Sequence, residues 1–376
     1  MSKVLYFVAG EASGDEHGAA LMSALREAQP DLEFHGRGGP QMKAGAVTEF
    51  RDWIEAAGVV GLWEVIKQYG YFRAQFRETL DEIQNAQPVA VVLIDYPGFN
   101  LRLARALRKR SPKQKIIYYI SPQVWAWNRG RIRAMARTLN LMLCIFPFEA
   151  DLYNRSGLRT VFVGHPMIKN LGRRQMDSTR NPNLIGFFPG SRLREVRKIF
   201  PAMIGAALEI LKMRPATQFE AAAASEALAA EIQQLLLQSP LPRDKVRVGV
   251  GETSAIMQRA FVGIVASGTA TLEAAYFRLP FVLVYRVSWL TYLAARLVVR
   301  VKYLGMPNVL ANEQIVPEVI QHQVKARPIA DAALSLMNNS AARERMTSKF
   351  DEIVSTLGKE DASMTAGRAI LEEIKS

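Results

Sequence analysis

Short, mostly apolar segments alternate with longer segments that carry charge on one face along the first half of the chain. The apolar segments are VLYFVAG (4–10), VAVVLID (89–95), KIIYYIS (115–121), LMLCIF (141–146) and TVFVGH (160–165). The segments between these apolar runs have a helical pattern, as the one from Phe99 to Arg110 illustrates. Strands that are apolar on both faces, with helices between them, predict a parallel sheet covered by helices on both sides.

The same alternation begins again after a polar stretch, KNLGRRQMDSTRNPN (169–183), which is typical of a linker. A strand-like run, LIGFFPGS (184–191), is followed by a predicted helix from Leu193 to Met213, and further strand-like runs follow. The chain of 376 residues is also longer than one ordinary core requires. We therefore expect an α/β protein of two doubly wound, Rossmann-like domains.

The expected domain limits are residues 1–168 and 169–376. The tail from Ile329 has a helical pattern, and its last helices can pack back on the first domain. Sheets of this kind bind ligands at the carboxyl ends of their strands. The sequence therefore predicts a site in a central cleft that both domains face.

The composition adds a charge argument. The chain has 48 Lys and Arg residues, 35 Asp and Glu residues, and a formal net charge of +13. This excess indicates an acidic partner (nucleic acid, anionic lipid or a phosphorylated substrate) or only a basic solvated surface. The single cysteine, Cys144, fits a reducing compartment such as the cytoplasm. No apolar run reaches the roughly eighteen residues of a membrane span.

Two loops in the second half predict a site for a nucleotide diphosphate. In FFPGSRLREV (187–196), Gly190 permits a tight turn, Ser191 can cap the following helix, and Arg192 adds a forked cation. The alternative is a capped helix with an exposed arginine. A bound phosphate is the natural complement of such a loop.

The segment VASGTATLEAAYFRLP (265–280) repeats this arrangement. A strand ends at Ser267, Gly268 and Thr269, and the helix that begins there favours an anion. Glu273, one turn into the helix, can accept both hydroxyls of a ribose, although it can also be an ordinary surface glutamate. No Asp-x-Asp metal motif occurs, and the four histidines lack metal-ligand spacing. We therefore expect neither a metal nor another cofactor, and Arg192 would meet the leaving-group charge.

In the first half, VLIDYPGFNLRLA (92–104) places Asp95 at the carboxyl end of a central strand. Asp95 could act as a general base if burial raises its pKa, or it could only cap the next helix. The opening segment FVAGEASGDEHG (7–18) has glycines at a spacing that does not fit a dinucleotide fingerprint, so an oxidoreductase is disfavoured. Trp125, Trp127 and the arginines that follow them lack the repeated stacking pattern of an RNA-binding module.

Nine motifs in one order carry a resemblance to a known family. They are AGEASGD, GVVGLWEV, IDYPGFN, SPQVWAW, FPFE, GHPM, PGSRLREV, SGTATLEAA and MPNVLANEQIVPE. Together they resemble the lipid-A-disaccharide synthases from about residue 5 to about residue 320. The resemblance implies an inverting GT-B glycosyltransferase that joins UDP-2,3-diacylglucosamine to 2,3-diacylglucosamine 1-phosphate (lipid X) and releases UDP. The product is a β-1,6-linked disaccharide, the precursor of lipid A.

The resemblance also implies roles for individual residues. The first turn would face the acceptor rather than a phosphate, so its acidic residues would not hinder binding. Glu11 would orient the base or itself take the proton in place of Asp95. The implied acceptor-binding residues are Gly10, Ser13, Gly14, Asp15, Asn100, Ser121 and Trp125. Asn308 is implied to contact UDP. Gly98 departs from the family pattern, because many members carry an aspartate there.

Two segments predict contact with a membrane surface without spanning it. Gly58–Phe76 is apolar and aromatic, and Ser288–Leu304 has an apolar stripe flanked by basic residues. We expect a peripheral enzyme at the inner face of the cytoplasmic membrane that does not bind nucleic acid. The sequence is compatible with a homodimer and with a monomer. The alternative function is that of another GT-B enzyme, such as a UDP-sugar epimerase or a peptidoglycan glycosyltransferase.

Overall fold

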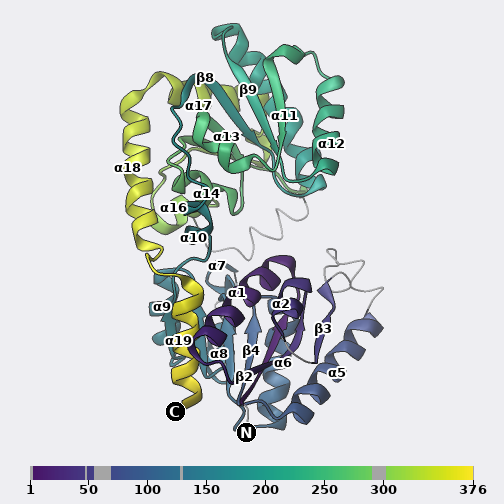
Figure 1. Ribbon diagram of the computed structural model, residues 1–376. Helices are drawn as coiled ribbons and strands as arrows, with labels where there is room; N and C mark the ends of the chain where they lie inside the picture. Colours follow the sequence, from purple (N-terminus) through teal and green to yellow (C-terminus); the bar gives the residue numbers. More distant parts are fainter. Residues whose placement is uncertain (1–2, 47–48, 55–68, 128–129, 290–301, 376) are drawn as a thin grey trace. The chain divides into compact units, whose positions relative to one another are not determined.

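The computed structural model describes residues 3–46, 49–54, 69–127, 130–289 and 302–375 (Figure 1). The chain forms two compact units. Unit 1 consists of residues 1–166 and 357–376, and unit 2 consists of residues 167–356. None of the helices in the described ranges is long and apolar enough to cross a membrane.

Unit 1 is built on a seven-stranded parallel sheet with the order β3-β2-β1-β4-β5-β6-β7. The strands are β1 (Lys3–Ala9), β2 (Leu32–Gly38), β3 (Phe50–Asp52), β4 (Ala90–Ile94), β5 (Ile116–Tyr119), β6 (Leu141–Cys144) and β7 (Thr160–Phe162). The helices are α1 (Ala12–Ala28), α2 (Pro40–Gly45), α5 (Tyr69–Ala86), α6 (Pro97–Arg110), α7 (Val124–Trp127), α8 (Gly130–Ala136), α9 (Pro147–Asn154) and α19 (Ala362–Lys375).

Strand β1 explains why the apolar runs of this unit are continuous. Leu5 and Phe7 belong to a buried cluster with α1 and α19 on one face of the sheet. Tyr6 and Val8 belong to a second cluster with α5 and α6 on the other face. Because both faces are covered, successive residues of the strand are all buried, as the pattern predicted.

Unit 2 has a six-stranded parallel sheet with the order β10-β9-β8-β11-β12-β13. The strands are β8 (Asn181–Phe188), β9 (Gln218–Ala223), β10 (Val246–Val250), β11 (Ala260–Ala266), β12 (Phe281–Tyr285) and β13 (Glu318–Ile320). The helices are α10 (Met167–Gly172), α11 (Leu193–Met213), α12 (Glu226–Leu237), α13 (Thr253–Arg259), α14 (Ala270–Tyr276), α16 (Met306–Ala311), α17 (Ala326–Asn338) and α18 (Ser340–Thr356). The doubly wound prediction is thus confirmed for each unit.

Two local predictions differ from the structure. The polar stretch 169–183 is not all linker, because α10 ends only at Gly172 and β8 already begins at Asn181. The first turn, in the opening segment, is also shorter than its glycines suggest, because α1 begins at Ala12. Gly18 therefore lies inside α1, where a Cβ atom would come within 2.4 Å of the Met42 sulfur. This glycine permits close packing against α2 rather than a turn.

The end of the described chain returns to unit 1. Helix α18 packs in unit 2 on α14 and α17, whereas α19 packs on α1. Ala366 and Ile370 of α19 share a buried cluster with Leu21 and Leu25. The small residue Gly367 brings the two helices close, and Glu373 accepts a 2.7 Å hydrogen bond from Arg159.

Candidate functional site

Asp95 follows the last residue of β4 in an unusual backbone conformation. Asp95 and Tyr96 both have positive φ angles, 43° and 49°. Two successive left-handed residues other than glycine are costly unless their surroundings hold them. Here the Asp95 N–H donates to the Tyr119 carbonyl at 2.9 Å, and the Asp95 carbonyl accepts from Tyr118 Oη at 2.5 Å. The backbone at the proposed base is therefore fixed from the neighbouring strand β5.

Asn100 completes this support from the first turn of α6. Its fully buried Nδ2 donates to the Asp95 carbonyl at 2.8 Å and to the Ile94 carbonyl at 3.1 Å. The structure therefore gives Asn100 a structural role at the strand end, where the sequence prediction made it an acceptor ligand. It acts on the site through the backbone of Asp95.

The electrostatic environment of Asp95 favours a base that works near neutral pH. Burial raises the pKa of Asp95 to about 6, and the nearby carboxylate of Glu11 adds to the rise, while the backbone N–H of Tyr96 opposes it. Glu11 is exposed and precedes α1 with no side-chain capping bond. The structure thus brings together the two carboxylates that the sequence paired as candidates for the base.

An aromatic group beside Asp95 was not predicted from the sequence. The Tyr96 ring lies against Gly10, where a Cβ atom would come within 2.3 Å of its Cδ1 atom. Trp53 packs edge-on against Tyr96 and Phe99, and its indole N–H donates to the Ala9 carbonyl at 2.6 Å. Gly10 is therefore needed for the close approach of an aromatic ring. No local pattern indicated this contact, because Trp53 and Tyr96 are more than forty positions apart.

Asp15 is the clearest correction to the predicted acceptor residues. Its side chain is buried, with Oδ1 accepting from the N–H groups of Gly39 and Met42 and Oδ2 from that of Gln41, all at 2.9–3.0 Å. Asp15 therefore caps the start of α2 and has no oxygen facing solvent for a sugar hydroxyl. Ser13, on the same turn of α1, is exposed, and Gly14 is buried beside Ala9.

We expect Asp15→Asn to lower the free energy of unfolding of unit 1 by about 2–3 kcal/mol, because an amide group would face backbone N–H donors that now meet a carboxylate. Urea denaturation followed by tryptophan fluorescence is the measurement, since four of the five tryptophans lie in residues 1–166. The exposed Ser13→Ala is the control and should change stability by less than about 0.5 kcal/mol. Equal stability of the two variants would contradict the capping role.

Ser121 and Trp125 surround a buried acid that the sequence did not single out. Trp125 is buried, and its indole N–H donates to Glu149 Oε1 at 2.9 Å. Glu149 Oε2 accepts from the Phe146 N–H at 3.2 Å, and burial raises the pKa of Glu149 to about 7. The Ser121 hydroxyl is buried beside this carboxyl group. Trp125 therefore does not offer an open ring to the acceptor, contrary to the prediction.

The first predicted phosphate loop of unit 2 lies where β8 leads into α11. Gly190 has φ 113°, which favours glycine, and a Cβ atom there would meet Glu195 Oε2 at 2.5 Å. The N-cap is Arg192 rather than Ser191, and the Arg192 side chain makes no capping bond. Among the described residues no side chain accepts a hydrogen bond from the N–H groups of that turn, as an anion site requires. The Arg192 side chain is 70% exposed and lies 3.4 Å from Glu195.

The second predicted loop joins β11 to α14. Gly268 has φ 146° and open space around its Cα atom, and Thr269 is the N-cap of α14 without a side-chain capping bond. Ser267 donates to the Leu304 carbonyl at 3.4 Å. Glu273 is half-buried, and its Oε1 accepts from the Ser254 hydroxyl at 2.7 Å. Ser254 therefore orients the carboxylate that the sequence assigned to a ribose.

Asn308 does not fit its predicted role as a ligand of UDP. The side chain is completely buried, and Nδ2 donates to the Val316 carbonyl and to Glu318 Oε1, both at 2.9 Å. Oδ1 accepts from the N–H groups of Ile315 and Val316 at 2.7 and 2.8 Å. These four bonds use the full capacity of the amide. Asn308 therefore holds the loop between α16 and β13.

In the part of the chain that the structure describes, no three His, Cys, Asp or Glu side chains come close enough to hold a metal ion. Two of the histidines are neighbours in unit 1: burial lowers the pKa of His165 to about 4, with His17 adding to the effect. Burial also lowers the pKa of His17. Both rings are therefore neutral at physiological pH.

Comparison with known proteins gives consistent matches over nearly the whole chain. A family model described as Lipid-A-disaccharide synthetase matches residues 5–370. A protein of Geobacter sulfurreducens named Lipid-A-disaccharide synthase is 36% identical over 378 residues, covering 98% of this chain and 96% of its own length.

Solved structures with similar folds are more distant in sequence. A UDP-GlcNAc 2-epimerase from Neisseria meningitidis bound to UDP-GlcNAc has a TM-score of 0.59 at 11% identity and covers both chains completely. A structure described as the glycotransferase of kitacinnamycin has a TM-score of 0.62 at 13% identity, covering 99% of this chain and 98% of its own. At such identities the likeness concerns the fold alone, and that fold, two doubly wound units in one chain, is GT-B.

Proposed function

The chain belongs to the lipid-A-disaccharide synthase family, and from this premise we propose which substrates it joins and which side chains act on them. It is a glycosyltransferase of lipid A biosynthesis that uses a UDP-sugar donor and a lipid acceptor. The proposed donor is UDP-2,3-diacylglucosamine, and the proposed acceptor is 2,3-diacylglucosamine 1-phosphate. The products are then a β-1,6-linked disaccharide 1-phosphate and UDP.

The donor's nucleotide is proposed to bind to unit 2. The uncapped first turn of α11 and the cation of Arg192 would hold the diphosphate. The open backbone at Gly268 leaves room for a ligand atom to approach. Glu273, oriented by Ser254, would accept the ribose hydroxyls. In this proposal no metal is needed, because Arg192 and the backbone N–H groups meet the charge that develops on UDP.

The acceptor is proposed to bind to unit 1, where Asp95 acts as the general base. The 6-hydroxyl loses its proton to the Asp95 carboxylate while its oxygen forms a bond to the donor's anomeric carbon. The bond from that carbon to the β-phosphate breaks, and its electron pair leaves with UDP. A single displacement of this kind inverts the anomeric configuration. Glu11 supports the reaction by keeping the pKa of Asp95 high enough for it to be an effective base.

The observation that carries this proposal is the raised pKa of Asp95 on a backbone held in a strained conformation at the strand end. The test is incubation of the protein with both purified substrates and mass spectrometry of the products. We expect equimolar UDP and disaccharide 1-phosphate, and no change of the donor alone. Isomerisation of the donor without acceptor would instead favour the epimerase alternative.

Membrane association is a further part of the proposal. The substrates carry acyl chains, and the chain has a net charge of +13. Of the two segments predicted to touch a bilayer, Gly58–Phe76 and Ser288–Leu304, residues 58–68 and 290–301 lie outside the described residues. We propose a cytoplasmic protein that binds peripherally to the inner face of the cytoplasmic membrane, as a monomer or a homodimer.

We expect the protein to co-sediment with vesicles that contain anionic phospholipid, and raised salt to release only part of it. Salt screens charges over about 10 Å at 0.1 M but leaves the burial of apolar side chains intact. The amounts in pellet and supernatant at low and high salt are the measurement, with vesicles of neutral lipid as the control. Absence of the protein from every low-salt pellet would refute peripheral binding.

A further inference from the structure

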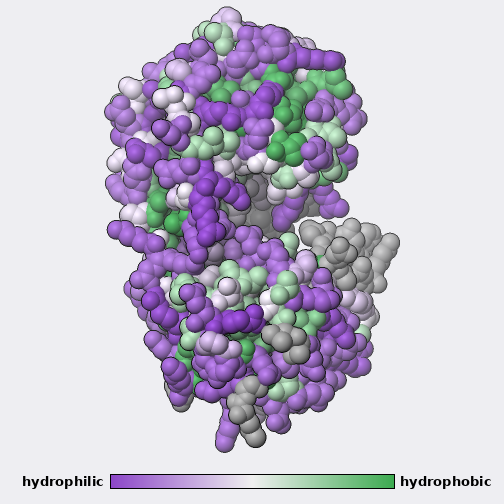
Figure 2. All heavy atoms as spheres, viewed as in Figure 1, coloured by the Kyte–Doolittle hydropathy of each residue, from purple (hydrophilic) through white to green (hydrophobic). Residues whose placement is uncertain are grey.

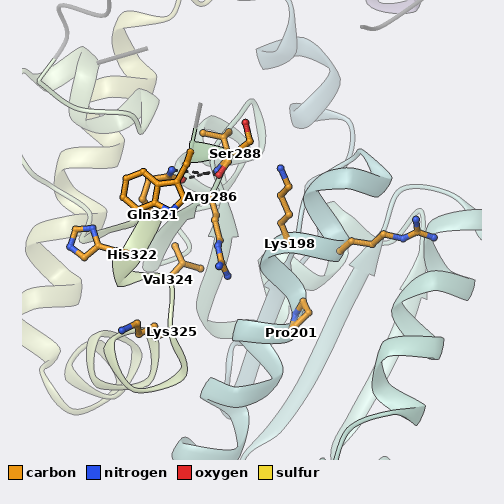
Figure 3. A pocket seen from close by; sticks show the side chains of 11 residues that line it. Lys198, Pro201, Arg286, Ser288, Gln321, His322, Val324 and Lys325 are labelled. Atoms are coloured by element: carbon orange, nitrogen blue, oxygen red, sulfur yellow. Dashed lines mark hydrogen bonds between the residues drawn. The ribbon is translucent and has the colours of Figure 1, made fainter. Parts of the chain in front are cut away.

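Unit 2 has a cavity at the carboxyl edge of its sheet, beside the ends of β12 and β13 (Figure 3). Its volume is about 610 Å³, within the usual range for small-ligand pockets. The lining comes from the second and third turns of α11, the segment after β12, and the segment that leads from β13 to α17. None of these residues belongs to the two loops proposed to bind UDP.

The cavity is lined by cations. The basic residues are Arg197, Lys198, Arg286, His322 and Lys325. No aspartate or glutamate is among the described residues of the lining. Arg197 already has a partner, because its guanidinium binds Glu231 at 2.8 Å. Within the described ranges, no carboxylate lies at ion-pair distance from Lys198, Arg286 or Lys325, whose charge is therefore available to a ligand.

The wall that carries Arg286 is held in place by a buried amide. Gln321 is 5% exposed and has a φ of 53°, a conformation that is costly for a residue other than glycine. Its Oε1 accepts from the Val287 N–H at 2.7 Å, and its Nε2 donates to the Val287 carbonyl at 3.5 Å (Figure 3). Gln321 thus fixes the segment after β12 through both backbone polar groups of Val287. A wall fixed in advance loses little freedom when a ligand binds.

The cavity also has an apolar side. Pro201, Val287 and Val324 contribute to the lining, and Trp289 is 60% exposed. In Figure 3, Lys198 rises from α11 on one side of the cavity, while Arg286, Val324 and Lys325 lie on the other. An exposed tryptophan beside cations suits a ligand that has a charged group next to an apolar one.

We propose that this cavity binds a phosphate group, carried either by an anionic lipid or by a free phosphorylated molecule, at a site separate from the nucleotide loops. Lysine and arginine together are the usual partners of phosphate oxygens, and several cations can share one dianion. The proposal does not depend on the identity of the transferase substrates. The two sources of phosphate differ in whether they also use the apolar wall at Trp289.

The test compares two double variants that remove the same charge. The cavity variant carries Lys198→Ala and Arg286→Ala, which together remove two cations from the lining. Lys212→Ala with Lys349→Ala removes two exposed lysines elsewhere in unit 2, each paired with a glutamate on its own helix. The first probe is a phosphatidylcholine vesicle with one-fifth phosphatidylglycerol, and the second is inorganic phosphate at constant ionic strength. Lys198, Lys212 and Arg286 are exposed and the Lys349 side chain is 42% exposed, so both proteins should fold.

For at least one probe we expect the cavity variant to bind about tenfold more weakly, because two charge-assisted contacts are lost, whereas the control should stay within about twofold. If lipid is the source, vesicle binding falls and Trp289→Ala lowers it too. If a free phosphorylated molecule is the source, only phosphate binding falls. Equal losses in both double variants, or binding of neither probe by the parent, would overturn the proposal. A loss of UDP affinity in the cavity variant would also overturn it, since the cavity would then belong to the nucleotide site.

Discussion

Asp95→Asn is expected to slow disaccharide formation about 10²–10⁴-fold, the usual cost of losing a general base. The amide has nearly the shape of the carboxyl group but cannot take the proton of the 6-hydroxyl. The Asp95 contacts to Tyr118, Tyr119 and Asn100 all use backbone atoms, so the substitution leaves them intact. Initial rates with labelled donor are the measurement, together with titration of UDP, whose affinity should not change.

The pH dependence gives an independent check on the same residue. A base must be ionised to accept a proton, so kcat/KM should fall as the pH drops below about 6, the pKa of Asp95. Glu11→Gln removes a negative charge that raises this pKa, and it should therefore move the acidic limb of the profile to lower pH. Asp95→Asn should abolish the limb. A rate within about threefold of the parent, or roughly 0.6 kcal/mol in barrier, would exclude Asp95 as the base and direct attention to Glu11.

Stability distinguishes lost chemistry from lost folding. The pKa of Asp95 is higher in the folded protein than its ordinary value, so this carboxyl group contributes most to stability when protonated, and the contribution is lost as pH rises to 6. At pH 7 the ionised group costs an estimated 1–3 kcal/mol. Asp95→Asn should therefore melt no lower than the parent at that pH. A lower melting temperature would mean that the slow rate reflects misfolding.

Arg192→Ala is expected to weaken UDP binding about 10- to 100-fold, which corresponds to the roughly 1.5–3 kcal/mol of one hydrogen bond to a charged group. The Arg192 side chain is exposed and contacts only Glu195 at 3.4 Å among the interactions found in the described residues. Its loss should leave the melting temperature unchanged, because such a surface pair contributes little. Isothermal titration with UDP is the measurement.

Lys212→Ala is the matched control, because this lysine lies near the other end of the same helix α11 and has a similar contact to Glu209. It should leave UDP affinity unchanged. If Arg192→Ala bound UDP and turned over at the rate of the parent, the first turn of α11 would not be a phosphate site. The nucleotide site would then consist of the loop at Gly268 and Glu273 alone.

The features that the sequence predicted well are those specified by a local periodic pattern of apolar and polar residues. The bounds of α11 agree with the predicted helix from Leu193 to Met213, since its apolar stripe repeats over five turns. Most strands of both sheets were visible as apolar runs, whereas the short or partly polar strands β2, β3 and β13 were not predicted. Family membership followed from the order of the motifs. Asp95 was a candidate because parallel strands expose their carboxyl ends to ligands.

The misassigned residues have partners distant in sequence. Asp15 caps a helix that begins 25 positions later, and Trp125 meets Glu149 24 positions on. Asn308 closes a shorter loop, but its four bonds run mainly to backbone atoms of any residue type. Such contacts leave no trace in composition or spacing. A polar residue that braces a site and one that binds a substrate are therefore indistinguishable in a single sequence.

The return of α19 to unit 1 has a consequence for how this protein is made. Residues 1–166 leave the ribosome first, yet the helix that covers α1 arrives only after all of residues 167–356. Until α19 is made, Leu21 and Leu25 belong to an incomplete core. Unit 2 is a continuous stretch of chain, so it can already fold during this time. The apolar face of α1 that α19 covers therefore stays exposed throughout that interval. A premature stop before Ala362 would spare unit 2 and leave the half that carries Asp95 without one layer of its core.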